Sequence, residues 1–198
     1  MSIERWEIAS SSEIHFTVRH LLISKVRGRF TRWSGTVQVP DGDWARATVD
    51  VVIDASSIDT GVAKRDTDLR SAHFLDIARY PVITFQTLYV TALQADALQI
   101  VGELTMKDRV GEVTLETESS GVTLDASGYE PARFSAKAAI RRRDFGASGN
   151  VAWDNYGVMI GERIDIEIDV EAVRQPAAAI SFLPAGIREP LRAPSIER

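Results

Sequence analysis

The chain has 198 residues, of which 44% are hydrophobic and 26% charged, with a formal net charge of -5 and no cysteine. A single all-β domain of roughly 200 residues fits this length. The acidic balance argues against a nucleic-acid-binding surface, and the lack of cysteine excludes disulfides and thiol chemistry. No apolar run approaches the ~20 residues that cross a bilayer, and the N-terminus has no apolar signal core. We therefore expect a cytoplasmic protein with no integral membrane span and no nucleic-acid partner.

The first part of the chain alternates apolar and polar residues, which is the period of a β-strand. Ile14, Phe16 and Val18 share one side of the first clear strand, and His15, Thr17 and Arg19 share the other. The same alternation predicts further strands within 25–39 and 47–54.

Alternation stops between residues 59 and 81. Good helix formers and an Asp66/Arg70 pair at i, i+4 predict a short helical segment near 63–79. The segment must end before Pro81, because a residue that precedes proline avoids helical geometry.

Strands then resume and continue to the last regular stretch, in which Ile164, Ile166 and Ile168 alternate with charged residues. The pattern predicts strands at 82–90, 97–106, 112–119, 132–142 and 163–173. About eight strands with short connections are typical of an antiparallel sandwich or barrel. Four of the seven prolines lie beyond residue 175, so we divide the chain into a domain at 1–175 and a Pro-rich C-terminal extension at 176–198.

The sequence offers little for catalysis or metal binding. His15 and His20 fall on opposite faces of one strand, so they do not form a zinc site. No nucleophile elbow, phosphate-binding loop or dinucleotide fingerprint is present. For Arg65/Asp66, a salt bridge that fixes a helix or turn is favoured over catalysis. We predict no catalytic residue, no metal and no cofactor.

Apolar strand faces, by contrast, are abundant. An eight-stranded barrel can be filled by its own side chains or can hold one small ligand. The small residues Gly102, Ala136 and Ala138 favour a barrel with room inside.

Six stretches stand out in this order along the chain. They are "SEIHFTVRHLLISKVRGRF" (12–30), "DASSIDTG" (54–61), "KRDTDLRSAHFLDIARYPVITF" (64–85), "GELTMKD" (102–108), "RRRDFG" (141–146) and "GERIDIEIDVEAVR" (161–174). Together they resemble the YceI-like family of polyisoprenoid-binding proteins with a lipocalin-like barrel.

The resemblance implies an all-β, eight-stranded antiparallel lipocalin-like barrel over 1–175, with the helical segment packed at its side or mouth. It also implies a long apolar tunnel for an isoprenoid-like or fatty-chain lipid, and homodimers are common in the family. This sequence departs from the family pattern in three places. Ser11–Ser12 replace a His-Ser pair, the turn 107–109 is more charged, and Trp153 is displaced in a loop expected to border the tunnel.

We therefore predict a non-catalytic carrier for a long-chain amphiphilic lipid such as a polyisoprenoid, an isoprenoid quinone or a fatty amide. An enzyme acting on a lipid in the barrel is one alternative, and it requires His20 and a carboxylate to face the cavity together. A stress-related sequestering protein for hydrophobic small molecules is another. Arg19, Lys25, Arg65 and Arg142 are candidates for contact with a head group. The predicted ligand-binding residues are Phe16, Val18, His20, Phe30, Leu69, Phe74, Phe85, Leu104, Met106, Phe134, Ala136, Ile140 and Trp153.

Overall fold

A computed structural model describes residues 2–20, 24–94, 96–122, 131–149 and 160–176. Trp153 lies outside these residues, as do positions 177–198 of the predicted C-terminal extension. The side chain of His20 also lies outside the described part, although its backbone belongs to a strand. The boundary of the extension therefore stays a prediction.

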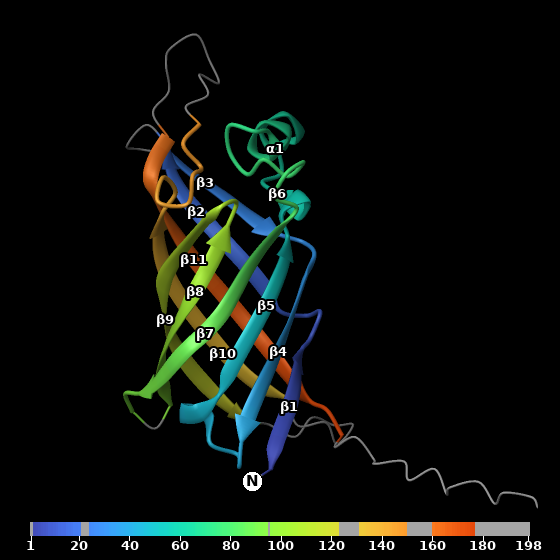
Figure 1. Ribbon diagram of the computed structural model, residues 1–198, viewed down its shortest axis with the longest axis vertical. Coiled ribbons are helices and arrows are strands. Elements are labelled where there is room, and N and C mark those ends of the chain that lie inside the picture. Colours follow the sequence, from blue (N-terminus) through green and yellow to red (C-terminus); the bar gives the residue numbers. More distant parts are fainter. Residues whose placement is uncertain (1, 21–23, 95, 123–130, 150–159, 177–198) are drawn as a thin grey trace, which may run out of the picture.

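The described residues form one continuous antiparallel sheet that curls into a tall barrel (Figure 1). Its strands are β1 (Ile3–Ile8), β2 (Glu13–His20), β3 (Ser24–Phe30), β4 (Trp33–Pro40), β5 (Thr48–Asp54), β6 (Ile58–Asp59), β7 (Val82–Ala92), β8 (Ala97–Met106), β9 (Arg109–Val122), β10 (Ala132–Arg141) and β11 (Ile160–Arg174). Single turns η1 (Trp44–Arg46) and η2 (Ala55–Ser57) flank β5, and α1 (Ala63–Arg70) lies at one end of the barrel.

The sheet closes because β11 pairs with two different strands along its length. Its last residues pair with β1, and its earlier residues pair with β2. At the bend between these two strands, the Ser12 hydroxyl accepts the N–H of Glu171 at 2.8 Å and so preserves the ladder. β3 and β4 pair in the same way with β2 and β1. If β1 with β2 and β3 with β4 are each counted as one bent strand, and the two-residue β6 is left aside, the barrel has eight strands. The predicted eight-stranded barrel is therefore confirmed, and the sandwich is excluded.

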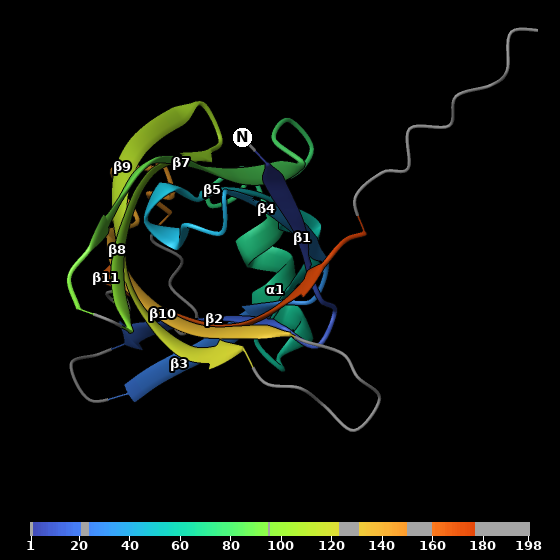
Figure 2. The same ribbon diagram turned by 90° about the horizontal axis from the view of Figure 1, so that it is seen from below.

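Inward-facing apolar side chains gather in two clusters at the two ends of the barrel. The cluster at the helix end, which is the end that carries α1, includes Phe85, Met106 and Ile140. The opposite end, named here the Trp44 end, has its own cluster around Trp6 and Val39. A second view, along the barrel axis from below, shows the strands as a ring (Figure 2). The middle of the barrel lies between these two clusters.

The predicted helical segment is confirmed but is shorter than 63–79. α1 ends at Arg70 because Ser71 is extended and its hydroxyl donates to the Asp68 carbonyl at 2.7 Å. No helix among the described residues is long and apolar enough to cross a membrane.

Two side chains of α1 dock the helix onto the barrel. Asp66 accepts from the N–H of Thr60 at 3.0 Å, and Arg70 donates to the carbonyls of Ser56 and Ile58 at 2.8 and 2.6 Å. The expected i, i+4 pairing of Asp66 with Arg70 is therefore replaced by contacts with the segment that follows β5. Backbone groups in this irregular segment and in the two-residue strand β6 offer well-placed hydrogen bonds.

Two glycines of the wall leave space that an aromatic ring fills. A Cβ on Gly28 would lie 2.3 Å from the Phe16 ring, and one on Gly102 would lie 2.4 Å from the Phe85 ring and 2.6 Å from the Gln86 carbonyl oxygen. The expectation that Gly102 leaves open room in the barrel is therefore wrong, because the Phe85 ring occupies that room.

We expect Gly102→Ala to lower the free energy of unfolding by about 1–3 kcal/mol, because the new methyl group overpacks the wall. Gly28→Ala is the matched control, since its Cβ meets only the end of a movable ring. Urea unfolding followed by tryptophan fluorescence measures both. An equal loss at the two positions would contradict the role of the Gln86 carbonyl.

Candidate functional site

An elongated cavity of about 280 Å³ lies inside the barrel, and every strand contributes to its wall. The wall extends along β11 from Ile160 to Val170. At ~3.3 Å per residue and a strand tilt of ~40°, this stretch spans about 25 Å of the barrel axis. The barrel interior is thus not filled by its own side chains.

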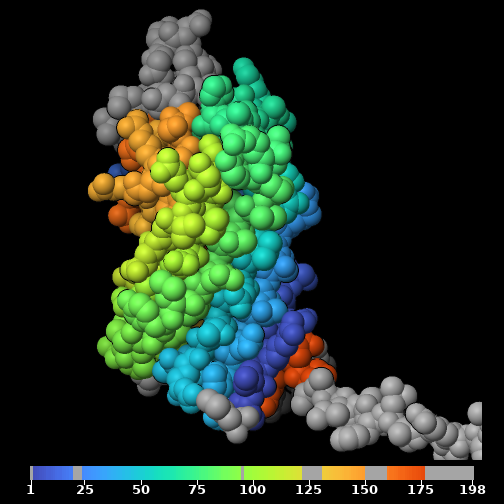
Figure 3. Space-filling model, viewed as in Figure 1, coloured from blue at the N-terminus to red at the C-terminus, as the bar shows by residue number. Residues whose placement is uncertain are grey.

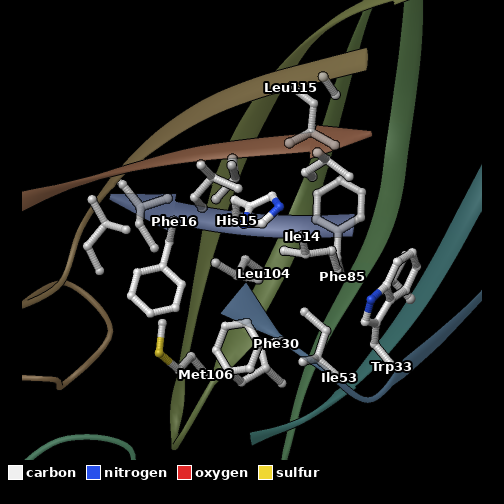
Figure 4. Close-up of a pocket in the computed structure, with 18 of the residues that line it drawn as sticks. Ile14, His15, Phe16, Phe30, Trp33, Ile53, Phe85, Leu104, Met106 and Leu115 are labelled. Atoms are coloured by element: carbon white, nitrogen blue, oxygen red, sulfur yellow. The ribbon is translucent and has the colours of Figure 1, made fainter. Parts of the chain in front are cut away.

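The wall is made almost entirely of aliphatic and aromatic side chains (Figure 4). Phe16, Phe30, Phe85 and Met106 lie around the space in the close-up. No residue that lines the cavity in the described part of the chain carries a carboxylate. An apolar cavity of this kind stays dry and takes apolar ligands.

Eleven of the thirteen predicted ligand-binding residues line this cavity. They are Phe16, Val18, Phe30, Leu69, Phe74, Phe85, Leu104, Met106, Phe134, Ala136 and Ile140. The other two are His20, whose side chain is not described, and Trp153, which lies outside the described residues. That these eleven contact a ligand stays a prediction.

Sequence reasoning missed two tryptophans of the wall. Trp33 begins β4 and Trp44 begins η1, and both line the cavity. Trp44 follows a "PDGD" turn, where no alternation indicates which way a side chain points. The one local signal for a fixed Trp44 is Asp43, a residue type that caps helical turns, directly before it.

Arg142 is a buried arginine at the helix end of the cavity. Its guanidinium donates to the carbonyls of Gly161, Ala147 and Gly149 at 3.1, 2.7 and 3.1 Å, and to Glu162 Oε1 at 3.2 Å. Burial lowers the pKa of the Arg142 guanidinium, while the Glu162 carboxylate opposes this shift. Arg142 therefore joins the chain after β10 to the start of β11.

The other candidate cations of the helix end differ in their surroundings. Arg65 lines the cavity and donates to the hydroxyl and carbonyl of Thr60 at 2.7 and 2.8 Å. Arg19 also borders the cavity and is exposed. Lys25 stands directly opposite Arg19 in the β2–β3 pairing but is not part of the wall. Arg65 thus fixes a turn, as expected, but it does so by binding Thr60 rather than by a salt bridge to Asp66. Of these cations, Arg19 is the one best placed at the rim of the cavity to meet a head group.

Aromatic rings close the Trp44 end. The ring centroid of Trp44 lies 5.3 Å from that of Trp6 and 4.9 Å from that of Phe134. Trp44 and Phe134 face the cavity, whereas Trp6 belongs to the buried cluster behind them. The cavity therefore has charged groups at the helix end, whereas the Trp44 end is aromatic and its lining near Ala136 includes the uncharged Thr117.

The sequence model of one protein family, the YceI-like domain, matches residues 6–172, which is most of the chain. The protein belongs to the YceI-like family. The YceI protein of Escherichia coli O157:H7 is 34% identical over 162 residues, which cover 82% of this chain and 81% of that protein.

Two solved structures share the fold of this YceI-like protein. Burkholderia cenocepacia BcnA has a TM-score of 0.72 at 18% identity, covering 84% of this chain and 99% of the other. A polyisoprenoid binding domain from Saccharophagus degradans has a TM-score of 0.63 at 17% identity, covering 86% and 98%. Both confirm the predicted lipocalin-like barrel.

We expect Arg142→Met to destabilise this YceI-like protein by about 3 kcal/mol or more, because several carbonyls around the guanidinium lose a charged donor. Arg143→Met is the control, since Arg143 contacts the same Glu162 at 2.9 Å but is exposed, and a surface pair contributes about 1 kcal/mol or less. Thermal and urea unfolding compare the two. Equal losses would show that Arg142 is no more than a surface charge.

Proposed function

We propose that this protein binds a long-chain amphiphilic lipid, a polyisoprenoid first of all, and carries it without covalent chemistry. The observation that supports the proposal is the elongated apolar cavity inside the closed barrel. The Saccharophagus degradans neighbour, described as a polyisoprenoid binding domain, supports it independently.

The energetics favour a chain of several isoprene units. Burial is worth ~0.8 kcal/mol per CH₂, so a few five-carbon units offset the ordering costs and approach the about 8 kcal/mol of micromolar binding. A cavity of ~150 Å³ holds benzene, so the open volume here fits on the order of ten carbons. The longer wall admits more carbons if flexible side chains such as Met106 move aside.

The charge distribution supports one orientation for the lipid. Cationic side chains border the cavity at the helix end, and the Trp44 end is aromatic. A polar or anionic head therefore lies near Arg19, and the hydrocarbon chain points towards Trp44. An isoprenoid quinone or a fatty amide would use the same arrangement with a different head.

Native mass spectrometry of protein purified without detergent tests the proposal. We expect the wild type to retain long-chain lipid, or to take up added prenyl alcohols with an affinity that rises with chain length. Leu115→Trp fills the middle of the cavity and should weaken binding at least ~10-fold, as overfilled hydrophobic pockets do. Thr114→Trp places the same bulk next to it on the outer face and should bind normally.

A protein that stays empty in the presence of every chain length would overturn the proposal. Recovery of a chemically altered lipid would instead favour an enzyme, and equal binding of unrelated amphiphiles would favour a sequestering protein. The cytoplasmic location and the homodimer stay predictions.

Arg19→Gln should weaken binding of a prenyl phosphate about 3–10-fold and leave binding of the matching prenyl alcohol unchanged, because a rim charge acts only on the charged head. Arg27→Gln is the control, since Arg27 pairs with Glu167 at 3.0 Å and lies outside the cavity. Titration at low and high salt measures the effect. Loss of alcohol binding in Arg19→Gln would contradict the proposed orientation.

A further inference from the structure

Aromatic rings are packed together at the Trp44 end of the cavity, and this group of Trp44, Phe134 and Trp6 is named here the floor. Trp44 lies against Phe134 and Trp6 in tilted ring contacts, with interplanar angles of 53°. Behind these rings, Val39 and Ala172 are fully buried. Close-packed interiors yield little to an incoming group, so a chain that reaches these rings meets packed side chains rather than open cavity.

The turn that carries Trp44 is held on both sides. Asp43 Oδ1 accepts the N–H of Ala45 at 3.0 Å, and the Asp43 carbonyl accepts the N–H of Arg46 at 3.1 Å. The Trp44 carbonyl in turn accepts the N–H of Ala47 at 3.2 Å. These bonds fix the backbone below the indole, which limits its freedom to swing away from the cavity.

The indole also lies between the cavity and the outside of the barrel. Trp44 is half-buried although it lines the cavity, and no residue of η1 is buried. In the view from below, the segment just before β5, drawn in cyan, reaches inward across this end (Figure 2). The outer surface of the barrel shows the same blue-green segment at its lower end (Figure 3).

We propose that Trp44 is the stop that sets the longest hydrocarbon chain the barrel accepts. The inference rests on the proposed lipid binding and adds the residue that determines chain-length specificity. A chain that fits ends against the indole, and a longer one must leave carbons in water at the helix end. Because one methylene too many in a closed hydrophobic pocket changes binding by ~10–200-fold, a fixed floor produces a sharp limit.

Competition among prenyl alcohols of increasing length, read by native mass spectrometry, tests the stop. We expect the wild type to lose at least ~10-fold in affinity beyond one chain length, and Trp44→Ala to remove that limit and accept chains at least about one isoprene unit longer. Trp33→Ala is the matched control, because Trp33 lines the same cavity from the start of β4 at the helix end. It should change all affinities alike and keep the limit in place.

A second variant moves the floor the other way. Ala136 lines the cavity next to Phe134 in β10, so Ala136→Leu adds bulk above the floor and should shorten the longest accepted chain. This result remains available even if Trp44→Ala does not fold.

The possible outcomes separate the two proposals. If the wild type binds prenyl chains and neither Trp44→Ala nor Ala136→Leu moves the limit, the stop is wrong and lipid binding stands. If Trp33→Ala moves the limit as far as Trp44→Ala does, cavity volume rather than the floor sets chain length, which also overturns the stop. If the wild type binds no chain, both proposals fail together.

Discussion

Closure of the sheet along β11 is the constraint on which the rest of the structure depends. One strand supplies the ladder partners for both β1 and β2, so every apolar face of the sheet turns towards the same interior. A closed barrel has no free edge, and its inward positions are fixed by the two-residue period. Most of the interior is therefore apolar, as the alternation of Ile164, Ile166 and Ile168 already indicates.

Whether that interior is full or hollow depends on how side chains of different size meet across it. The ends of the Phe16 and Phe85 rings lie against Gly28 and Gly102, where any larger residue would collide with them. Each ring thus occupies space that the glycine leaves free. An elongated and mostly apolar cavity remains between the strands.

The two ends of the barrel have different chemistry. At the helix end, three guanidinium groups donate hydrogen bonds to backbone oxygens that lie outside the strands. They belong to Arg65, Arg70 and Arg142. Buried polar groups must be satisfied, so these arginines build the rim, and Arg19 is left at the surface beside it. At the Trp44 end, tilted aromatic contacts replace hydrogen bonds. The proposed orientation of the lipid rests on this asymmetry.

The strand faces and nine strand residues of the cavity wall follow from the amino-acid sequence alone, because the period of alternation is a local property of the chain. The short helix was also predictable, from helix formers where alternation stops. The sequence also carried the family resemblance, which the match over residues 6–172 confirmed. Three features came only from the folded chain: Phe85 covers Gly102, Asp66 and Arg70 bind the segment after β5 rather than each other, and the Trp44 ring packs against Phe134 at one end of the cavity. Each of these depends on contacts between residues far apart in the chain, and no local pattern encodes which partner a ring or a guanidinium meets once the barrel has closed.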